Sequence, residues 1–226
     1  MVTIRKDQLE NNHIYHVFNR SIAGYTIFNS QGEFNRIIKL IKLCRYNNFN
    51  HRFSQFIDLD AFTQIAIVDQ LNKENDVMVE IIAYCIMPTH IHLLLKQITD
   101  NGITKFMGKV LNSYSKYFNT KHQRTGPLWS GRFKNVLVEN DEQLLHLTRY
   151  IHLNPTSASL CQNPEDWDYS SYLEYINLVD DKNILCRFSD YIYFLSDEYK
   201  KFVDDRKSYQ QDLSIIKDQL IDDYSG

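Results

Sequence analysis

Two histidines, His90 and His92, stand one residue apart in an apolar stretch and are the side chains best suited to chemistry. Apolar runs on both sides of Met87-Pro88-Thr89 predict two strands joined by a short turn. Alternate residues of a strand point to one face, so both imidazoles would project from the same side of a sheet. Neutral imidazole is a common nitrogen ligand for metal ions, so the pair could hold one cation.

The His-x-His spacing alone leaves a second interpretation open. It also fits two partly exposed histidines on the open face of a sheet, because so short a pattern has many chance matches. Two ligands do not complete a metal site, so the rest of the chain has to supply a third ligand and a reacting group.

Length and composition are those of an ordinary globular protein. The chain has 226 residues, of which 43% are hydrophobic and 23% charged, and its 7 glycines and 4 prolines make long linkers improbable. The 4 cysteines form no Cys-x-x-Cys pair, which favours buried thiols in a reducing compartment. No apolar signal region and no run of about 18 apolar residues occurs, so we expect a cytoplasmic protein without a membrane partner.

Charge is distributed unevenly although the formal net charge is only −3. The segment 104–138 contains no acidic residue, whereas acidic residues outnumber basic ones after Ser196. A local basic segment is typical of phosphate binding, but it equally fits the solvated face of a helix. The basic residues of this segment are Lys105, Lys109, Lys116, Lys121, Arg124, Arg132 and Lys134.

The order of predicted elements indicates an α+β fold of the ferredoxin-like, RNA-recognition-motif-like type. In such a fold, helices cover one face of a four-stranded antiparallel sheet and leave the other face free for a ligand. If Ile91 and Leu93 pack on the helices, His90 and His92 lie on the free face. The predicted elements are a strand at 14–18, a helix at 33–46, strands at 79–86 and 91–95, a helix at 104–117 and a strand at 132–138.

A further helix is predicted from a cap at Asn140 or Asp141 to Asn154, ending before Pro155. Tyr150 and Asn154 lie one turn apart at one border of its apolar stripe. A tyrosine in this position is usually part of the core with its hydroxyl in water. Alternatively, its phenol oxygen is a usable nucleophile and a good leaving group in phosphodiester chemistry.

Five segments together resemble the single-tyrosine (Y1) HUH transposases of the IS200/IS605 type, and in particular their REP-associated tyrosine transposase branch. The segments occur in the family's order and cover roughly residues 12 to 175. They are Tyr15-His16-Val17-Phe18-Asn19-Arg20, Met87-Pro88-Thr89-His90-Ile91-His92-Leu93-Leu94, Leu128-Trp129-Ser130-Gly131-Arg132-Phe133-Lys134, Arg149-Tyr150-Ile151-His152-Leu153-Asn154-Pro155 and Trp167-Asp168-Tyr169-Ser170-Ser171-Tyr172.

This resemblance implies binding of single-stranded DNA beside a hairpin. It also implies cleavage by Tyr150, which leaves a 5′-phosphotyrosine link and a free 3′-hydroxyl before strands are rejoined. His90 and His92 would be the metal pair, Asn154 the third ligand, and Mg²⁺ or Mn²⁺ the ion. Pro155 could distort the last helical turn and loosen the position of Asn154. A divalent ion suits the reaction because it neutralises a phosphodiester and stabilises its leaving oxygen.

Two regions depart from the family pattern, and they divide the chain into a transposase-like domain at 1–175 and an acidic helical extension at 176–226. Within the domain, the segment 47–78 is longer than expected and is predicted to contain an inserted helix or two. The extension could mask the basic surface as a flap, but packing as helices is favoured. It also favours a monomer, although a dimer that exchanges the tyrosine helix is possible.

Two other functions remain open on the sequence. One is a non-catalytic module that binds single-stranded nucleic acid by stacking and phosphate contacts. The other is a metal-dependent nuclease that uses water, with Tyr150 in a structural role. In each case the side chains expected to position phosphates are Arg20, Lys105, Lys109, Arg132 and Lys134.

Overall fold

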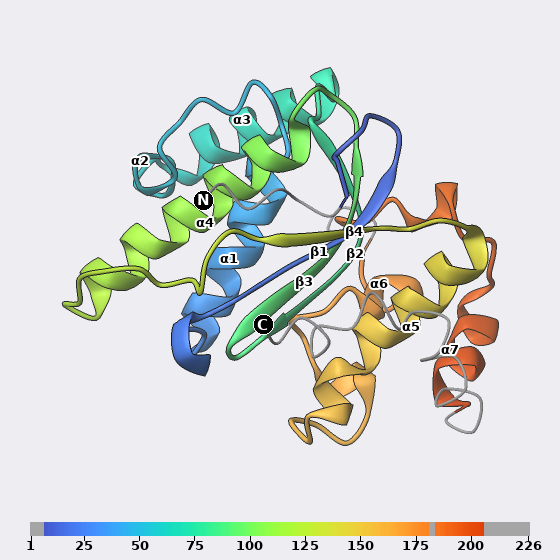
Figure 1. Ribbon diagram of the computed structural model, residues 1–226. Coiled ribbons are helices and arrows are strands. Elements are labelled where there is room, and N and C mark those ends of the chain that lie inside the picture. The colour runs from blue at the N-terminus through green and yellow to red at the C-terminus, as the bar shows by residue number, and fades with distance from the viewer. Residues whose placement is uncertain (1–6, 181–183, 206–226) are drawn as a thin grey trace.

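A single antiparallel sheet organises the molecule (Figure 1). The computed structural model describes residues 7–180 and 184–205. The strand order is β2-β3-β1-β4, which confirms the predicted ferredoxin-like arrangement. The strands are β1 (Ile14–Arg20), β2 (Val79–Met87), β3 (His90–Gln97) and β4 (Lys134–Leu137).

Helices α1 (Gln31–Cys44) and α4 (Gly102–Lys121) pack together on one face of the sheet (Figure 1). Ile91 and Leu93 of β3 are fully buried in the core beneath them, as the sequence predicts. Because strand residues alternate, the intervening residues His90 and His92 point to the opposite face. The apolar stripes of both helices are buried in this same core, which is the larger of the two cores formed by the described residues.

The opposite face is occupied by α5 (Asp141–Ser157) together with the chain that follows it (Figure 1). The sequence predicts that this face is free for a ligand. Instead, a second core forms here between α5 and β2. Leu147 and Ile151 of α5 are fully buried in it, as are Ala83 and Leu94 of the sheet. An amphipathic helix has to bury its apolar stripe, and this sheet face provides the apolar partner.

Helix α5 begins where the sequence predicts and ends later. The Asn140 side chain accepts a hydrogen bond of 2.8 Å from the Gln143 amide and caps the first turn. The predicted end before Pro155 is wrong, because the helix continues to Ser157 with Pro155 inside it. A proline removes one amide donor, but the bond from the Ala158 amide to the Asn154 carbonyl, 2.9 Å long, still closes the last turn.

Two helices, α2 (Phe53–Ile57) and α3 (Ala61–Glu74), occupy the predicted insertion at 47–78. They lie on the side of the sheet that carries α1 and α4 (Figure 1). Short elements complete the described chain: η1 (Ile22–Gly24), η2 (Pro164–Asp166), α6 (Tyr172–Tyr175), η4 (Phe188–Asp190) and α7 (Ser196–Asp204).

The outer edge of β2 is covered by chain that comes after α5. Backbone hydrogen bonds of 2.8–2.9 Å join Ile86 to Tyr169, Ser171 to Tyr84 and Arg187 to Ile81. The described part of the extension, 176–180 and 184–205, therefore packs against the sheet and α5. Residues 206–226, which the sequence analysis includes in the acidic tail, lie outside the described residues. The division into two domains stays a prediction.

Within residues 7–180 and 184–205, no helix has both the length and the apolar character needed to cross a bilayer.

Candidate active site

His90 and His92 lie side by side on β3, on the face that α5 covers. Their ring centroids are 4.9 Å apart and the rings are nearly perpendicular, at 84°. His92 is fully buried, whereas His90 is half-buried at the start of the strand. The two imidazoles thus share one face, as their spacing predicts, and one of them is accessible from outside.

A third histidine, His16 of β1, lies against His92. Its Nε2 atom is 3.0 Å from Nδ1 of His92, and the two rings stack at 14° with centroids 5.2 Å apart. The antiparallel register sets Phe18 directly opposite His92, which puts His16 on the same face one step along the strand. The sequence analysis did not assign a role to His16.

The buried ring nitrogen of His92 is suited to bind a metal ion. Nε2 of His92 is buried and has no hydrogen-bond partner among the described residues, while Nδ1 is held by His16. At His90, the Thr89 hydroxyl lies 2.9 Å from Nδ1. Metal-binding histidines usually have one ring nitrogen held by a neighbour and present the other to the ion. His92 follows this pattern, and the Thr89 hydroxyl lies where it can hold Nδ1 of His90.

The electrostatic surroundings keep His92 neutral. Burial lowers its pKa well below the ordinary value, and the neighbouring His90 and His16 lower it further. The neutral form of imidazole is the one that binds metals. The site therefore favours the protonation state that metal binding needs.

Tyr150 of α5 is brought against these imidazoles within the same chain. Its ring lies edge-on to His92, with centroids 5.7 Å apart at 87°, and to His16, at 6.2 Å and 81°. It is 8% exposed. The strand of the histidines and the helix of the tyrosine are far apart in the sequence. The contact between Tyr150 and His92 therefore depends on the tertiary fold and cannot be predicted from residue spacing.

Asn154, the predicted third ligand, lies one turn after Tyr150 and is half-buried. Its amide nitrogen donates a hydrogen bond of 2.9 Å to the Tyr150 carbonyl, which is its one side-chain hydrogen bond to a described residue. Among the described residues, no group of three or more His, Cys, Asp or Glu side chains has metal-site geometry. The imidazole pair would supply only two nitrogen ligands to an ion held here, so oxygen ligands would have to fill its remaining coordination positions.

Buried hydrogen bonds fix α5 and hence Tyr150. Nδ1 of His152 lies 2.7 Å from the Tyr199 hydroxyl on α7, and its Nε2 lies 2.8 Å from the Ser171 hydroxyl. The Tyr199 hydroxyl donates to Thr148, 3.0 Å away on α5. Burial lowers the pKa of His152 to about 3, so the ring is neutral and can donate with one nitrogen and accept with the other.

The predicted phosphate-positioning residues lie in three places. Arg20 is opposite His90 in the β1–β3 register, and Lys134 is opposite Phe18, which is itself opposite His92. Residues directly opposite each other share a sheet face, so Arg20 and Lys134 start on the face of the histidines. Lys105 and Lys109 belong to α4 on the other face. Arg132 is exposed in the loop just before β4.

Three supporting residues, His16, Thr89 and His152, were not predicted as part of the site. For His16, the alternation of residues in Ile14–Arg20 is a signal that could have been used. It puts His16 and Phe18 on the sheet face opposite to that of Tyr15 and Val17, which belong to the core. The register between β1 and β3 determines which histidine His16 contacts. That register cannot be predicted from the residue pattern of β1 alone.

The comparison with protein families shows what this part of the chain is similar to. Residues 50–154 match the family model described as "Transposase IS200 like". The matched segment includes the histidine pair, Tyr150 and Asn154.

Two individual proteins are similar to this chain, one in sequence and one in fold. The chain is 30% identical over 106 residues to a Haemophilus influenzae protein described provisionally as a REP-associated tyrosine transposase. That alignment covers 41% of this chain and 58% of the relative. A solved structure of a REP-associated tyrosine transposase bound to a REP hairpin matches with a TM-score of 0.53 and 13% identity, over 86% of this chain and 99% of the other. These matches confirm the predicted resemblance to the IS200-like transposases and their REP-associated branch.

Proposed function

We propose that this protein cleaves and rejoins single-stranded DNA, with Tyr150 as the nucleophile. The observation that supports this most directly is the position of Tyr150 beside His92, 5.7 Å between ring centroids, within one chain. A phenol next to a pair of metal-binding imidazoles combines a nucleophile with the means to neutralise a phosphodiester. A tyrosine that only completed a core would not need this arrangement.

Nε2 of His90 and of His92 are the proposed metal-binding atoms, with Asn154 as a candidate third ligand. When bound, Mg²⁺ or Mn²⁺ would supply Lewis-acid stabilisation of charge on the phosphate oxygens. The Asn154 amide points back to the Tyr150 carbonyl, so its oxygen is the atom that remains for an ion. Resemblance favours these two hard cations over the zinc that imidazoles alone would suggest.

His16 is proposed as a positioning residue for His92. Its hydrogen bond at 3.0 Å holds Nδ1 of His92, so Nε2 is the nitrogen left for an ion. Fixing one ring nitrogen selects a single tautomer and orientation of a buried imidazole. The stacked ring of His16 also fills the space in which His92 could otherwise rotate.

The reaction would be a transesterification at phosphorus. The Tyr150 phenol oxygen attacks the scissile phosphate and loses its proton to solvent or a neighbouring base. The bond from phosphorus to the 3′ oxygen breaks, and that oxygen leaves as a 3′-hydroxyl after taking up a proton. The 5′-phosphate stays linked to Tyr150 until another 3′-hydroxyl reverses the step. Because the ester bond is exchanged and not hydrolysed, no nucleotide cofactor is required.

The proposed substrate is single-stranded DNA next to a hairpin, by analogy with the REP hairpin bound in the structural relative. Arg20, Lys134 and Arg132 are proposed to hold phosphates near the cleavage point, since the first two share the face of the histidines. Tyr150 and the histidines come from one chain, which supports a monomer that is complete without exchange of helices.

The test is covalent capture of a DNA hairpin oligonucleotide with a single-stranded flank in the presence of Mn²⁺. The unmodified protein is expected to form an adduct that survives denaturation and is destroyed by protease. Tyr150→Phe should form none, because it lacks the phenol oxygen, yet should bind the same DNA. The matched control is Tyr193→Phe, which removes a hydroxyl from a side chain 88% exposed.

Two outcomes would contradict the proposal. Cleavage by Tyr150→Phe at the rate of the unmodified protein would assign the chemistry to another nucleophile. Product with no attached protein, dependent on metal, would indicate hydrolysis by water with Tyr150 in a structural role.

A further inference from the structure

Helix α3, which belongs to the insertion at 47–78, exposes apolar side chains to solvent. Of its 14 residues, Leu71 alone is buried. Phe62 is 82% exposed, Ile65 is 60% exposed, and Ile57 of the neighbouring α2 is 37% exposed. Single apolar residues are normal on a protein surface, but a group of them on adjacent helices indicates a binding surface.

A hollow of about 320 Å³ lies beside these side chains, between α1, α2 and α3. Its apolar wall consists of Leu43, Phe56, Ile57, Ile65 and Val68. Leu43 and Phe56 are buried in the larger core, so the floor is fixed, whereas Ile57 and Ile65 are exposed at the rim. A hollow of this kind accepts the apolar side chains of a bound helix. We call it the α1–α3 hollow.

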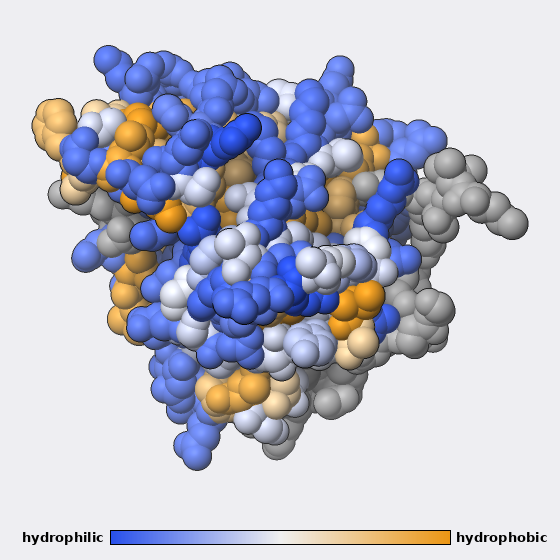
Figure 2. All heavy atoms as spheres, turned by 90° about the vertical axis from the view of Figure 1, so that its left-hand side faces the viewer, coloured by the Kyte–Doolittle hydropathy of each residue, from blue (hydrophilic) through white to orange (hydrophobic). Residues whose placement is uncertain are grey.

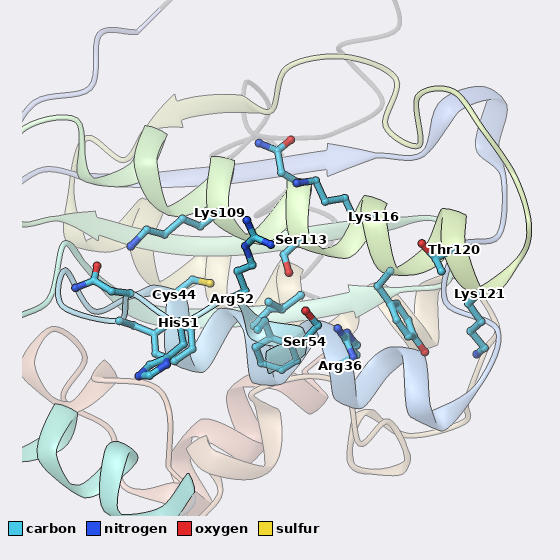
Figure 3. A pocket seen from close by; sticks show the side chains of 16 residues that line it. Arg36, Cys44, His51, Arg52, Ser54, Lys109, Ser113, Lys116, Thr120 and Lys121 are labelled. Carbon is cyan, nitrogen blue, oxygen red and sulfur yellow. The ribbon is translucent and has the colours of Figure 1, made fainter. Parts of the chain in front are cut away.

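A second cavity on this side of the sheet has a different character (Figure 3). It lies between α1, α4 and the segment 49–54, has a volume of about 920 Å³, and is lined by several basic side chains, such as Arg52 and Lys116. Figure 2, which views the molecule from the side where α2 lies, shows apolar areas within a mainly hydrophilic surface. The α1–α3 hollow therefore suits an apolar ligand, whereas the cavity of Figure 3 does not.

Charged side chains of opposite sign border the α1–α3 hollow. Lys39 and Lys42 come from α1, and Asp69 comes from α3. Lys39 and Asp69 are exposed, Lys42 is half-buried, and none of the three forms an ion pair with a described residue. The best occupant would therefore be an apolar helix with acidic residues on its α1 side and a basic residue on its α3 side.

The chain contains a segment with this pattern at 206–226, outside the described residues. Its apolar residues Tyr209, Leu213, Ile216 and Leu220 are spaced by four, three and four positions, as in the apolar stripe of a helix. The described chain ends three residues before Arg206 to Ser208 lead into this stripe at Tyr209. The pattern predicts an amphipathic helix that needs an apolar surface to bind.

The charges beside this stripe complement those of the hollow. At 3.6 residues per turn, Asp212 and Asp223 border one side of the stripe and Lys217 borders the other. A helix lying in the hollow in one of its two directions would set both acids toward Lys39 and Lys42. The same direction would set Lys217 toward Asp69, so the charges select how the helix lies.

The distance to the hollow decides which molecule supplies the segment. The described chain ends at Asp205, directly after α7, which packs on α5. Helices α2 and α3 lie on the other side of the sheet (Figure 1). Between Asp205 and Tyr209 the chain spans at most ~14 Å. The layers of α5, the sheet and α1 intervene, each about 10 Å from the next, so a helix that begins at Tyr209 cannot reach the hollow of its own molecule.

We propose that the α1–α3 hollow binds the 206–226 segment of a second copy of this chain. Two copies that exchange these segments would form a closed dimer with two-fold symmetry. Each copy keeps its own Tyr150 and histidines, so the dimer exchanges no part of the candidate active site and does not depend on the proposed function. The insertion at 47–78 and the extension, which both depart from the transposase pattern, would then act together in self-association.

The experiment is sedimentation velocity of the full chain across the micromolar concentration range. The hollow variant is Lys39→Glu/Ile65→Asn, and the segment variant is Leu213→Asn/Ile216→Asn. The matched control is Lys105→Glu/Leu178→Asn, which changes an exposed lysine of α4 and a leucine 67% exposed. The substitutions at Lys39 and Ile65 also affect exposed side chains, so folding should be retained.

The unmodified protein and the control are expected to dimerise with the same dissociation constant. The hollow and segment variants should each raise that constant by at least about tenfold, because each lacks one half of the contact. An equimolar mixture of the two variants combines one intact hollow with one intact segment. It should therefore dimerise more tightly than either variant alone and less tightly than the unmodified protein.

Three outcomes would overturn the proposal. An unmodified protein that remains monomeric throughout the range would show that no second copy binds, including the case in which the segment binds within its own molecule. Variants that dimerise as tightly as the control would place the contact elsewhere. A mixture that dimerises no better than its two components would show that the hollow and the segment do not bind each other.

Discussion

The two faces of the sheet carry polar groups of opposite kinds. On the face of α5, His16, His92 and Tyr150 are buried, and His92 is held neutral. On the face of α1 and α4, Arg52 and Lys116 are exposed and form no ion pair with a described residue. Burial fixes orientation and protonation state, which chemistry at one phosphate needs. Exposed charge gives long-range attraction and salt dependence, which binding of an extended polyanion needs.

The largest expected effect tests the chemical side of this comparison. His90→Ala removes one imidazole of the pair and leaves the buried His92 in place. It should lower the rate of adduct formation by at least about 100-fold, because the proposed ion loses a direct ligand. The salt dependence of DNA binding should be unchanged, because His90→Ala removes no lysine or arginine.

The control for this change is His13→Ala, which removes an exposed imidazole ahead of β1. Adduct formation is measured by denaturing gel over a range of Mn²⁺ concentrations. A rate equal to that of the unmodified protein would remove His90 from the reaction.

A smaller effect is expected when the support of His92 is removed. His16→Phe keeps a ring in the same space and deletes the partner of Nδ1 of His92. Half-saturation of the adduct rate should then require roughly 10–100-fold more Mn²⁺, while the rate at saturating Mn²⁺ stays close to normal. A lowered maximal rate with an unaltered Mn²⁺ requirement would mean that His16 does not act through metal binding.

The buried His152 should make the α5 side sensitive to acid. Its pKa of about 3 in the folded protein is below the unfolded value of about 6.5, so the unfolded chain takes up more protons as pH falls. Stability from this ring is complete above pH ~6.5 and decreases below it, by about 2 kcal/mol at pH 5. The rings of Tyr172, Tyr175 and Tyr199 surround the imidazole and carry no charge at that pH.

Urea unfolding at pH 7 and pH 5 measures this difference in the free energy of unfolding. His152→Gln retains a donor and an acceptor but does not titrate, so its stability should change less between the two pH values. A variant that loses as much stability as the unmodified protein would assign the acid sensitivity to other groups.

The smallest expected effects come from single basic residues on the histidine face. Lys134→Ala should reduce the salt slope for single-stranded DNA by about 0.7, the value for one phosphate contact. It should also reduce adduct formation at subsaturating DNA, unlike Lys73→Ala on α3. If Lys134→Ala matches that control in both measurements, it does not contact the strand.

The elements with strong periodicity were predictable from the sequence. Strands β2 and β3 have apolar runs on both sides of Pro88, and helices α1 and α4 have clear apolar stripes, so their pattern alone predicts them. The end of α5 was not predictable in this way. Pro155 suggests a stop, but a proline in the last turns removes only one hydrogen bond and packing maintains the helix.

The parts of the site that depend on tertiary contacts were not predictable from residue patterns. The meeting of Tyr150 with His92 was anticipated through the family resemblance and not from spacing. The partnership of His16 with His92 depends on strand register. The basic segment 104–138 looked like one surface because its residues are close in sequence. Lys109 and Lys134 belong to different layers, and this divides the segment between the two faces.

The covered edge of β2 also limits how copies of this protein can associate. Carbonyl and amide groups along β2 are already bonded to Tyr169, Ser171 and Arg187, and the side-chain nitrogen of Trp167 binds the Ile86 carbonyl at 3.1 Å. A second molecule therefore cannot extend the sheet by adding a strand there. Pairing of two copies along that edge would first require the segment after α5 to separate from β2, so the covered edge protects the folded protein against edge-to-edge aggregation.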